Sequence, residues 1–246
     1  MKTQILNDLK NLGIKNGDCL LAHTSFSSLG KGVSAKDLID ALCEAVGEEG
    51  TLLLPSLSWA NVTHENPVFN VAETPVCVGY LPEYFRTQYK GVKRSVHPTH
   101  SCCAIGKEAD EFVYGHENDD TPVGKNSPFY KLGKKSGKIL FIGCGTEPNT
   151  SMHGVEELVN PDYLYGDDIE YTITDATGNT YKKRYHTHGF KNTEQRYERL
   201  ENHLSSDEMK KGMILAASCT IMSASAVWKK GLEQYLLDPH YFVDFT

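Results

Sequence analysis

Short apolar runs alternate with helix-like segments through the first two-thirds of the chain, and this alternation most constrains the fold. The runs at 18–22, 50–55, 101–105 and 138–142 are too short for helices and too uniformly apolar for half-exposed strands. They are typical of strands buried on both faces. Helical segments at 3–12, 34–46, 81–89 and 108–114 separate them. The alternation predicts an α/β fold, a layered sheet with helices on both faces.

Beyond Gly166 the pattern changes to one of alternating polar and apolar residues. Residues 168–174 and 181–186 alternate in this way on either side of a turn at 176–179, which predicts a β-hairpin. A hairpin cannot be a parallel crossover unit, so we expect a mixed sheet. Helices are expected at 193–204 and 224–236, with a strand at 213–220. We predict one domain over 1–246, with 167–190 as a small hairpin subdomain or flap.

Composition narrows the class of protein. The 246 residues are 39% hydrophobic, enough for a real core, and the seven cysteines include no Cys-x-x-Cys pair, which argues against a disulfide framework or a thiolate zinc site. No stretch approaches the roughly 20 apolar residues of a membrane span, and no signal-peptide core opens the chain. We therefore expect a cytoplasmic protein with no membrane partner. A net charge of −7 disfavours nucleic acid as a partner.

The segment Thr150–Glu156 places an imidazole and a carboxylate three residues apart at an expected helix start. Thr150 or Ser151 is the expected N-cap. Residues at i and i+3 face the same way on a helix, so Glu156 can orient the ring of His153 and stabilise its protonated form. The pair is the equipment of a general base, although His-x-x-Glu on its own also describes an ordinary surface pair.

Five segments in order resemble the aminoglycoside 3-N-acetyltransferase family, also called the antibiotic N-acetyltransferase family. They are His23–Gly30, Gly50–Pro55, Arg94–Gly106, Gly124–Pro128 and Thr150–Glu156. The resemblance implies a fold unrelated to the Gcn5-type acetyltransferases. It also implies transfer of an acyl group from acetyl-CoA, or another acyl-CoA, to a primary amine of an amino sugar.

The resemblance also implies roles for individual residues. His153 becomes the base that deprotonates the amine in a direct transfer, and Glu156 orients it. Backbone amides and hydroxyl groups near the first strand are suited to hold phosphates or pantetheine amides. Ser101, at the start of a strand, is placed to donate to the thioester oxygen. The residues expected on the coenzyme A side are His23, Thr24, Ser25, Ser27, Gly30, Ser95 and Ser101.

The acceptor is open between two classes. A polycationic antibiotic favours carboxylates around the pocket, whereas a nucleotide-linked, dTDP-type amino sugar of surface-glycan biosynthesis favours cations near its diphosphate. Lys93, Arg94 and Lys125 are the candidate cations, and Trp59, Phe69 and Tyr80 are candidates to stack on a base or sugar. The residues expected to bind the acceptor are Trp59, His97, Asp119, Asp120 and Glu157.

Other readings of the residues remain open. His97 with His100, or His186 with His188, resembles a metal pair, but Pro98 breaks the first segment and no His-Glu-x-x-His motif occurs, so no metal is expected. Cys144 precedes the His–Glu pair and is a possible acyl-accepting nucleophile for a ping-pong transferase or an amidase. A non-catalytic binder of coenzyme A or sugar is a further alternative. The oligomeric state is open.

Overall fold

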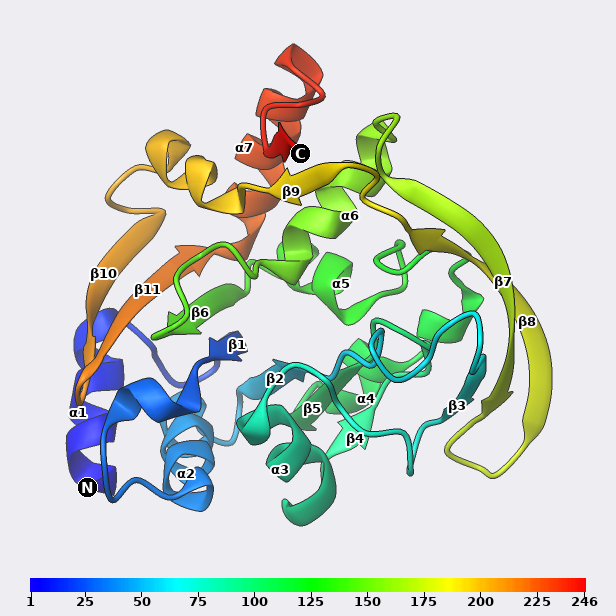
Figure 1. Cartoon of the computed structure of the whole chain (residues 1–246). Helices are drawn as coiled ribbons and strands as arrows, with labels where there is room; N and C mark the ends of the chain where they lie inside the picture. Colours follow the sequence, from blue (N-terminus) through cyan, green and yellow to red (C-terminus); the bar gives the residue numbers. More distant parts are fainter.

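A seven-stranded mixed sheet forms the centre of the computed structural model, which describes all residues, 1–246 (Figure 1). Its strand order is β10-β11-β6-β1-β2-β5-β4. Strands β6, β1 and β2 run parallel, and the strands on either side of them pair antiparallel. The expected mixed sheet is therefore confirmed. The strands are β1 (Cys19–Thr24), β2 (Thr51–Pro55), β4 (Lys93–Arg94), β5 (Cys102–Gly106), β6 (Lys138–Ile142), β10 (Met209–Ile214) and β11 (Ala217–Ser223).

Helices cover both faces of this sheet because consecutive strand residues point to opposite sides. In β1, Leu20 and Ala22 pack into one hydrophobic cluster and Leu21 packs into the other. The first cluster lies under α1 (Lys2–Leu12), α2 (Ala35–Val46) and α3 (Tyr80–Gln88). The second lies under α4 (Ala109–Val113), α5 (Pro128–Lys134), α6 (Thr150–Val159) and α7 (Ala224–Leu237). Uniformly apolar strands are thus explained by two buried faces.

The predicted hairpin is present and arches away from the central sheet (Figure 1). Its strands are β7 (Tyr165–Thr174) and β8 (Thr180–His188), both longer than their alternating cores suggested. The loop at 56–78 supplies a third strand, β3 (Val68–Asn70), which pairs parallel with β7. Phe69, Tyr171 and Tyr185 are buried in a small core of their own. Movement of the hairpin as a flap stays a prediction.

Two expectations near the C-terminus are wrong. Residues 193–204 form strand β9 (Thr193–Gln195) and the 3₁₀ helix η3 (Tyr197–His203) instead of one α-helix. Strand β9 pairs with β12 (Val243–Phe245), so a partner about fifty residues away overrides local propensity. The expected strand at 213–220 is a hairpin, because Leu215 adopts a left-handed conformation, with φ of 51°, between β10 and β11.

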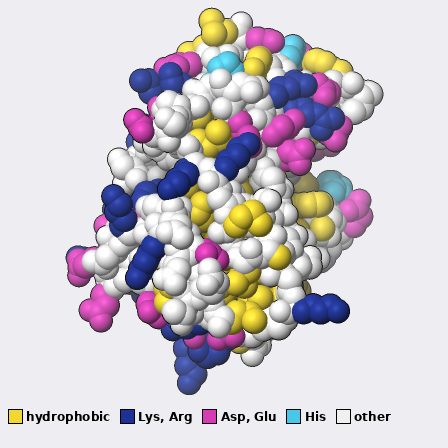
Figure 2. Space-filling model, turned by 90° about the vertical axis from the view of Figure 1, so that its left-hand side faces the viewer, with side chains coloured by type: hydrophobic (Ala, Val, Ile, Leu, Met, Phe, Trp, Pro, Cys, Tyr) yellow, Lys and Arg dark blue, Asp and Glu magenta, His cyan; other side chains and the backbone are white.

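The surface mixes both signs of charge. Figure 2, which looks onto the side that carries α1 and β10, shows lysine, arginine, aspartate and glutamate side chains interspersed with hydrophobic ones. None of the helices is long and apolar enough to cross a lipid bilayer. The remaining short elements are the 3₁₀ helices η1 (Phe26–Leu29) and η2 (His116–Asn118).

Candidate active site

Helix α6 begins beside the carboxyl ends of the parallel strands, where ligands generally bind in open α/β sheets. Its N-cap is Asn149, so the expected cap at Thr150 or Ser151 is displaced by one or two residues, and no side chain caps the helix. Gly154 allows α6 to approach α7, since a Cβ there would lie 2.3 Å from the Trp228 ring. This packing fixes the adjacent His153 at the start of the helix.

His153 and Glu156 do lie together, but a third residue joins them. Nδ1 of His153 is 3.3 Å from Oε2 of Glu156, a long contact. The hydroxyl of Tyr197 is 2.7 Å from the same Nδ1 and donates to Glu156 Oε2 at 2.5 Å. Because the hydroxyl has one proton and gives it to the carboxylate, it accepts from Nδ1–H. Nε2 of His153 is left as the unprotonated nitrogen, with no partner in the protein.

The carboxylate of Glu156 is fully buried. Burial alone would raise its pKa, but hydrogen bonds from His153 and Tyr197 outweigh this effect and hold the pKa below its ordinary value. Tyr163 donates a further hydrogen bond to Oε1 at 2.8 Å. Burial and the adjacent carboxylate raise the pKa of Tyr197 well above its ordinary value, so its hydroxyl stays protonated. The network therefore holds the ring of His153 in one tautomer.

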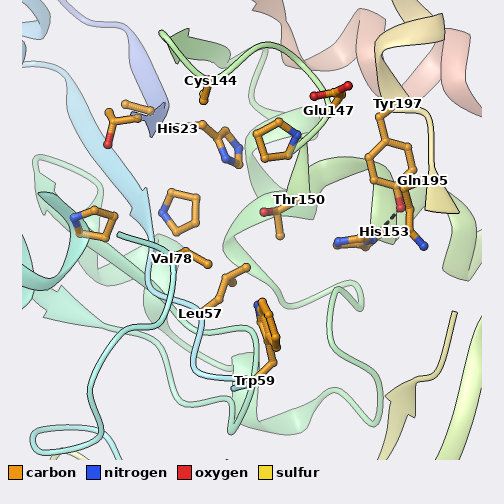
Figure 3. A pocket seen from close by; sticks show the side chains of 15 residues that line it. His23, Leu57, Trp59, Val78, Cys144, Glu147, Thr150, His153, Gln195 and Tyr197 are labelled. Carbon is orange, nitrogen blue, oxygen red and sulfur yellow. Dashed lines mark hydrogen bonds between the residues drawn. The ribbon is translucent and has the colours of Figure 1, made fainter. Parts of the chain in front are cut away.

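Two cavities meet at His153. The first has a volume of about 330 Å³ and extends past β1 and the start of α6 (Figure 3). The second, of about 540 Å³, extends toward the hairpin. Leu57, Trp59, His153 and Gln195 line both. One imidazole with a free nitrogen thus stands between two spaces, an arrangement suited to a reaction of two substrates.

His23 and Thr24 end strand β1 and line the first cavity. His23 Nε2 and Thr24 Oγ1 are buried without a hydrogen-bond partner in the protein. Such groups normally find partners, so both atoms are available to a ligand. Burial lowers the pKa of His23 to about 3, so its ring is neutral, and it stacks on Phe141 with centroids 5.0 Å apart. Figure 3 shows His23 across the cavity from His153.

Ser25, Ser27 and Gly30 belong to the segment around η1 and line neither cavity. The backbone N–H of Ser25 donates to Ile142 at the end of β6. A shallower depression of about 350 Å³, which includes the neighbouring Ser28, lies on this side of the sheet. The structure places these three residues near the first cavity's end of the sheet but gives them no part in its wall.

Ser95 and Ser101 are not placed to contact a ligand, in contrast to the sequence-based prediction. Both are fully buried and line neither cavity. Ser95 Oγ accepts from the backbone N–H of Cys102 and lies 2.9 Å from His116 Nδ1. Ser101 Oγ donates to the carbonyl of Ser56 and accepts from Arg94 Nε at 2.8 Å. Their hydroxyls hold the protein's own loops.

Arg94 is the centre of this loop anchorage. Its guanidinium is buried over the Phe69 ring and also donates to the carbonyls of Thr74 and Ser56, at 2.6 and 3.0 Å. Burial lowers the pKa of Arg94 to about 10, which keeps it charged at neutral pH. The residue fastens the loop at 56–78, which carries Leu57 and Trp59, to the edge of the sheet.

Of the residues expected to bind the acceptor, only Trp59 lines the cavities, with 54% of its surface exposed. His97 is buried outside both cavities, where its Nδ1 accepts from the backbone N–H groups of Thr99 and His100 and its ring stacks on His116. Its role is to shape a turn. Within the segment at 97–100, it is His100 and not His97 that lines a cavity.

The expected acidic residues also lie outside the two cavities. Asp119 accepts three hydrogen bonds from Asn126, and Asp120 forms an exposed ion pair with Lys183 at 3.2 Å. Glu157 is buried behind the second cavity, with one oxygen 2.8 Å from Nε2 of His188. These three carboxylates border a separate outer depression. A charge cluster in sequence is therefore a set of local structural contacts here.

His100 and His188 are site residues that the sequence-based prediction missed. Both line the second cavity, and their ring centroids lie 5.7 and 5.2 Å from that of His153. The sequence signal was the two closely spaced histidine pairs, which suggested metal. The structure contains no group of three or more His, Cys, Asp or Glu side chains that could hold a metal ion.

Cys144 lines the first cavity, as Figure 3 shows. Burial raises the pKa of its thiol to about 11. No imidazole forms a hydrogen bond with its sulfur, whose contact is the carbonyl of Gly145 at 3.5 Å. The thiolate is the nucleophilic form, so this environment opposes an acyl-accepting role.

Comparison with known proteins places this geometry in a family context. The sequence model of the family described as aminoglycoside 3-N-acetyltransferase matches residues 21–235. A relative from Bacillus subtilis (strain 168), the SPbeta prophage-derived aminoglycoside N(3')-acetyltransferase-like protein YokD, is 34% identical over 176 residues, which cover 63% of this chain and 64% of that protein. The chain matches less than two thirds of the length of its first curated relatives.

Two solved structures share the fold. One is AAC-IIIb in a binary complex with CoASH, with a TM-score of 0.82 and 25% identity over 95% of both chains. The other is a mutant of aminoglycoside acetyltransferase AAC(3)-IVa in complex with a gentamicin. It has a TM-score of 0.80 and 26% identity, over 98% of this chain and 90% of that one.

Proposed function

Because the chain belongs to the aminoglycoside 3-N-acetyltransferase family, we propose that it is an acyl-CoA-dependent N-acyltransferase that acetylates a primary amine of an amino sugar. The observation that carries the proposal is the position of His153 between two cavities, with Nε2 free and Nδ1 linked through Tyr197 to Glu156. Structures of similar proteins that hold CoASH or a gentamicin support one substrate in each cavity.

The first cavity suits the acyl donor. Its unpaired His23 Nε2 and Thr24 Oγ1 offer polar partners at the end of β1, and the opposite wall reaches His153. Acetyl-CoA, as co-substrate, supplies the thioester carbonyl there. The neutral ring of His23 offers a hydrogen bond without adding charge. The roles of His23 and Thr24 on the donor side are therefore retained in the proposal, while Ser25, Ser27 and Gly30 are assigned to the outer part of the donor path.

His153 performs the proton transfer. As the acceptor amine attacks the thioester carbonyl, Nε2 takes the proton that the nitrogen loses, and the proton leaves with the thiol of coenzyme A. Positive charge on the ring is stabilised by the buried carboxylate of Glu156 through Tyr197. One amide bond forms and one thioester bond breaks, with no acylated residue on the protein.

Two measurements test this function. Acetyl-CoA and a panel of amino sugars should yield free thiol together with an N-acetylated product of the expected mass. His153→Ala should abolish turnover while leaving coenzyme A binding intact by calorimetry. Binding of both substrates to the wild-type protein without thiol release would instead establish the non-catalytic alternative.

The nucleotide-linked acceptor gains no support from the site. Lys93 is paired with Asp110 on the surface, and Arg94 is buried among backbone carbonyls. Lys125 borders only the outer depression. None of the three lines either cavity that meets at His153, so nothing is placed to bind a diphosphate. A cytoplasmic location, where acetyl-CoA is plentiful, stays a prediction.

A further inference from the structure

The second cavity contains no formally charged side chain apart from the base itself when protonated. Aspartate, glutamate, lysine and arginine are all missing from its 13 lining residues. The wall is built of aromatic and aliphatic groups, three threonines, one glutamine and three histidines. The net charge of −7 therefore lies outside this cavity. The chemistry of this wall restricts the acceptors that it can hold.

Two of the three imidazoles are uncharged. His100 and His188 are deeply buried, and burial lowers the pKa of each well below its ordinary value. Nδ1 of His100 is 2.8 Å from Thr99 Oγ1, while its Nε2 has no partner in the protein. His100 thus presents one neutral hydrogen-bonding nitrogen to the cavity, beside the ring of His153.

The nearest carboxylates are already engaged. Glu156 is hydrogen-bonded to Tyr197 and Tyr163 and serves the catalytic histidine. Glu157 lies behind His188, and its two oxygens are occupied by Thr121, the backbone N–H of Val123 and the imidazole.

At the rim, the nearby Glu65 is fully exposed and accepts from Thr63 Oγ1 at 2.9 Å. A charge in that position is screened by water, which weakens its pull on a ligand inside the cavity. No free carboxylate faces the space beside His153.

An ammonium group that enters such a space loses water and finds no counterion, which costs free energy unless the group is deprotonated. Only the amine next to His153 can lose its proton there. Hydroxyl groups, in contrast, can bond to His100 Nε2 and to threonine hydroxyls, and Trp59 and Phe190 offer faces for a sugar ring.

We propose that the natural acceptor is a mono-amine with an uncharged, hydroxyl-bearing body, such as an amino sugar with a single amine, and not a polycationic antibiotic. The inference rests on the proposed function and specifies its substrate class. The reacting amine lies at His153 Nε2, and a hydroxyl of the same ring bonds to His100 Nε2. The edge-to-face packing of the two rings, 5.7 Å apart, suits groups on adjacent ring carbons.

The test compares acceptors that differ in the number of amines. With saturating acetyl-CoA, kcat/KM from thiol release is measured for D-glucosamine, 2-deoxystreptamine and kanamycin. We expect the value for glucosamine to exceed that for kanamycin at least about tenfold, with 2-deoxystreptamine between them. A kanamycin value equal to or above that of glucosamine would overturn the inference while sustaining the transferase. Absence of thiol release with every amine would overturn the transferase, and the inference with it.

A matched pair of variants tests the cause. Thr187 lines the second cavity on β8 and donates to a backbone carbonyl. Thr187→Asp should raise the kanamycin-to-glucosamine ratio of kcat/KM about tenfold by supplying a counterion. Thr187→Asn, similar in size and uncharged, should leave the ratio near that of the wild type. An unchanged ratio in the folded Asp variant, verified by circular dichroism, would refute the explanation by missing charge.

Discussion

The Tyr197 hydroxyl lies 2.7 Å from His153 Nδ1, closer than the carboxylate that the helix places three residues further on. The tyrosine comes from η3, 44 residues along the chain, and passes its own proton to Glu156. The general base is therefore oriented by a tertiary contact as much as by helix periodicity.

Tyr197→Phe should reveal this dependence. Loss of the hydroxyl leaves only the 3.3 Å contact between His153 and Glu156 and removes a donor from a buried carboxylate. We expect kcat to fall about 10- to 100-fold, as for loss of a hydrogen bond to a charged group, with little change in coenzyme A affinity. Tyr241→Phe, which removes a hydroxyl bonded to His203 outside the site, should retain wild-type kcat. Equal losses in both variants would contradict the proposed relay.

Cys144 separates direct transfer from a ping-pong reaction. Because burial raises the pKa of its thiol to about 11, we expect no acyl transfer to it at neutral pH. Intact-mass spectrometry of the protein with acetyl-CoA and no acceptor should show no covalent acyl group. Accumulation of an acylated protein that disappears in Cys144→Ala would establish the ping-pong route.

Glu157 should give stability an unusual dependence on pH. Burial raises its pKa to about 7 from 4.5 in the unfolded chain, so the folded state binds a proton more tightly. This contribution to stability is complete below pH 4.5 and is lost as pH rises through about 7, up to about 3 kcal/mol. Urea denaturation at several pH values should show that Glu157→Gln, which cannot ionise, removes this part of the decline. Parallel curves for the two proteins would exclude it.

Arg94 should matter far more for stability than its neighbour in sequence. Arg94→Met leaves the carbonyls of Ser56 and Thr74 without their buried donor, which we expect to cost about 2–4 kcal/mol. Lys93→Met breaks only an exposed ion pair with Asp110, worth about 0–1 kcal/mol. Thermal unfolding of the two variants measures the contrast, and similar midpoints would show that Arg94 does not anchor the loop.

Features set by nearby residues were predictable from sequence. The strand at 138–142 and the helix that carries His153 follow from apolar patterning, and the facing of His153 and Glu156 follows from helix geometry. Tyr197 was beyond reach because its surroundings have the pattern of a helix. Strand β9, which sets its approach, exists only through pairing with β12. No local signal reports a partner so distant in sequence.

Burial explains the other differences. Asp119 reads as a free acid, but Asn126, seven residues on, folds back to satisfy it. Ser101 and His97 lie in a motif shared with the family, where a residue that holds a loop looks the same in sequence as one that holds a ligand. His100 and His188 become neighbours only because the hairpin returns toward the sheet. Sequence reports which groups exist, whereas three-dimensional packing decides which remain free.

The ladder between β3 and β7 joins the loop that carries Trp59 to the hairpin that carries His188. Its ends are closed by the N–H of Thr172 on Pro67 and the N–H of Val71 on Thr174. Two walls of the second cavity are thereby one cooperative unit, with a single free energy of opening. The amide protons on both sides of this ladder should exchange with deuterium at a common rate, and acceptor binding should slow them together.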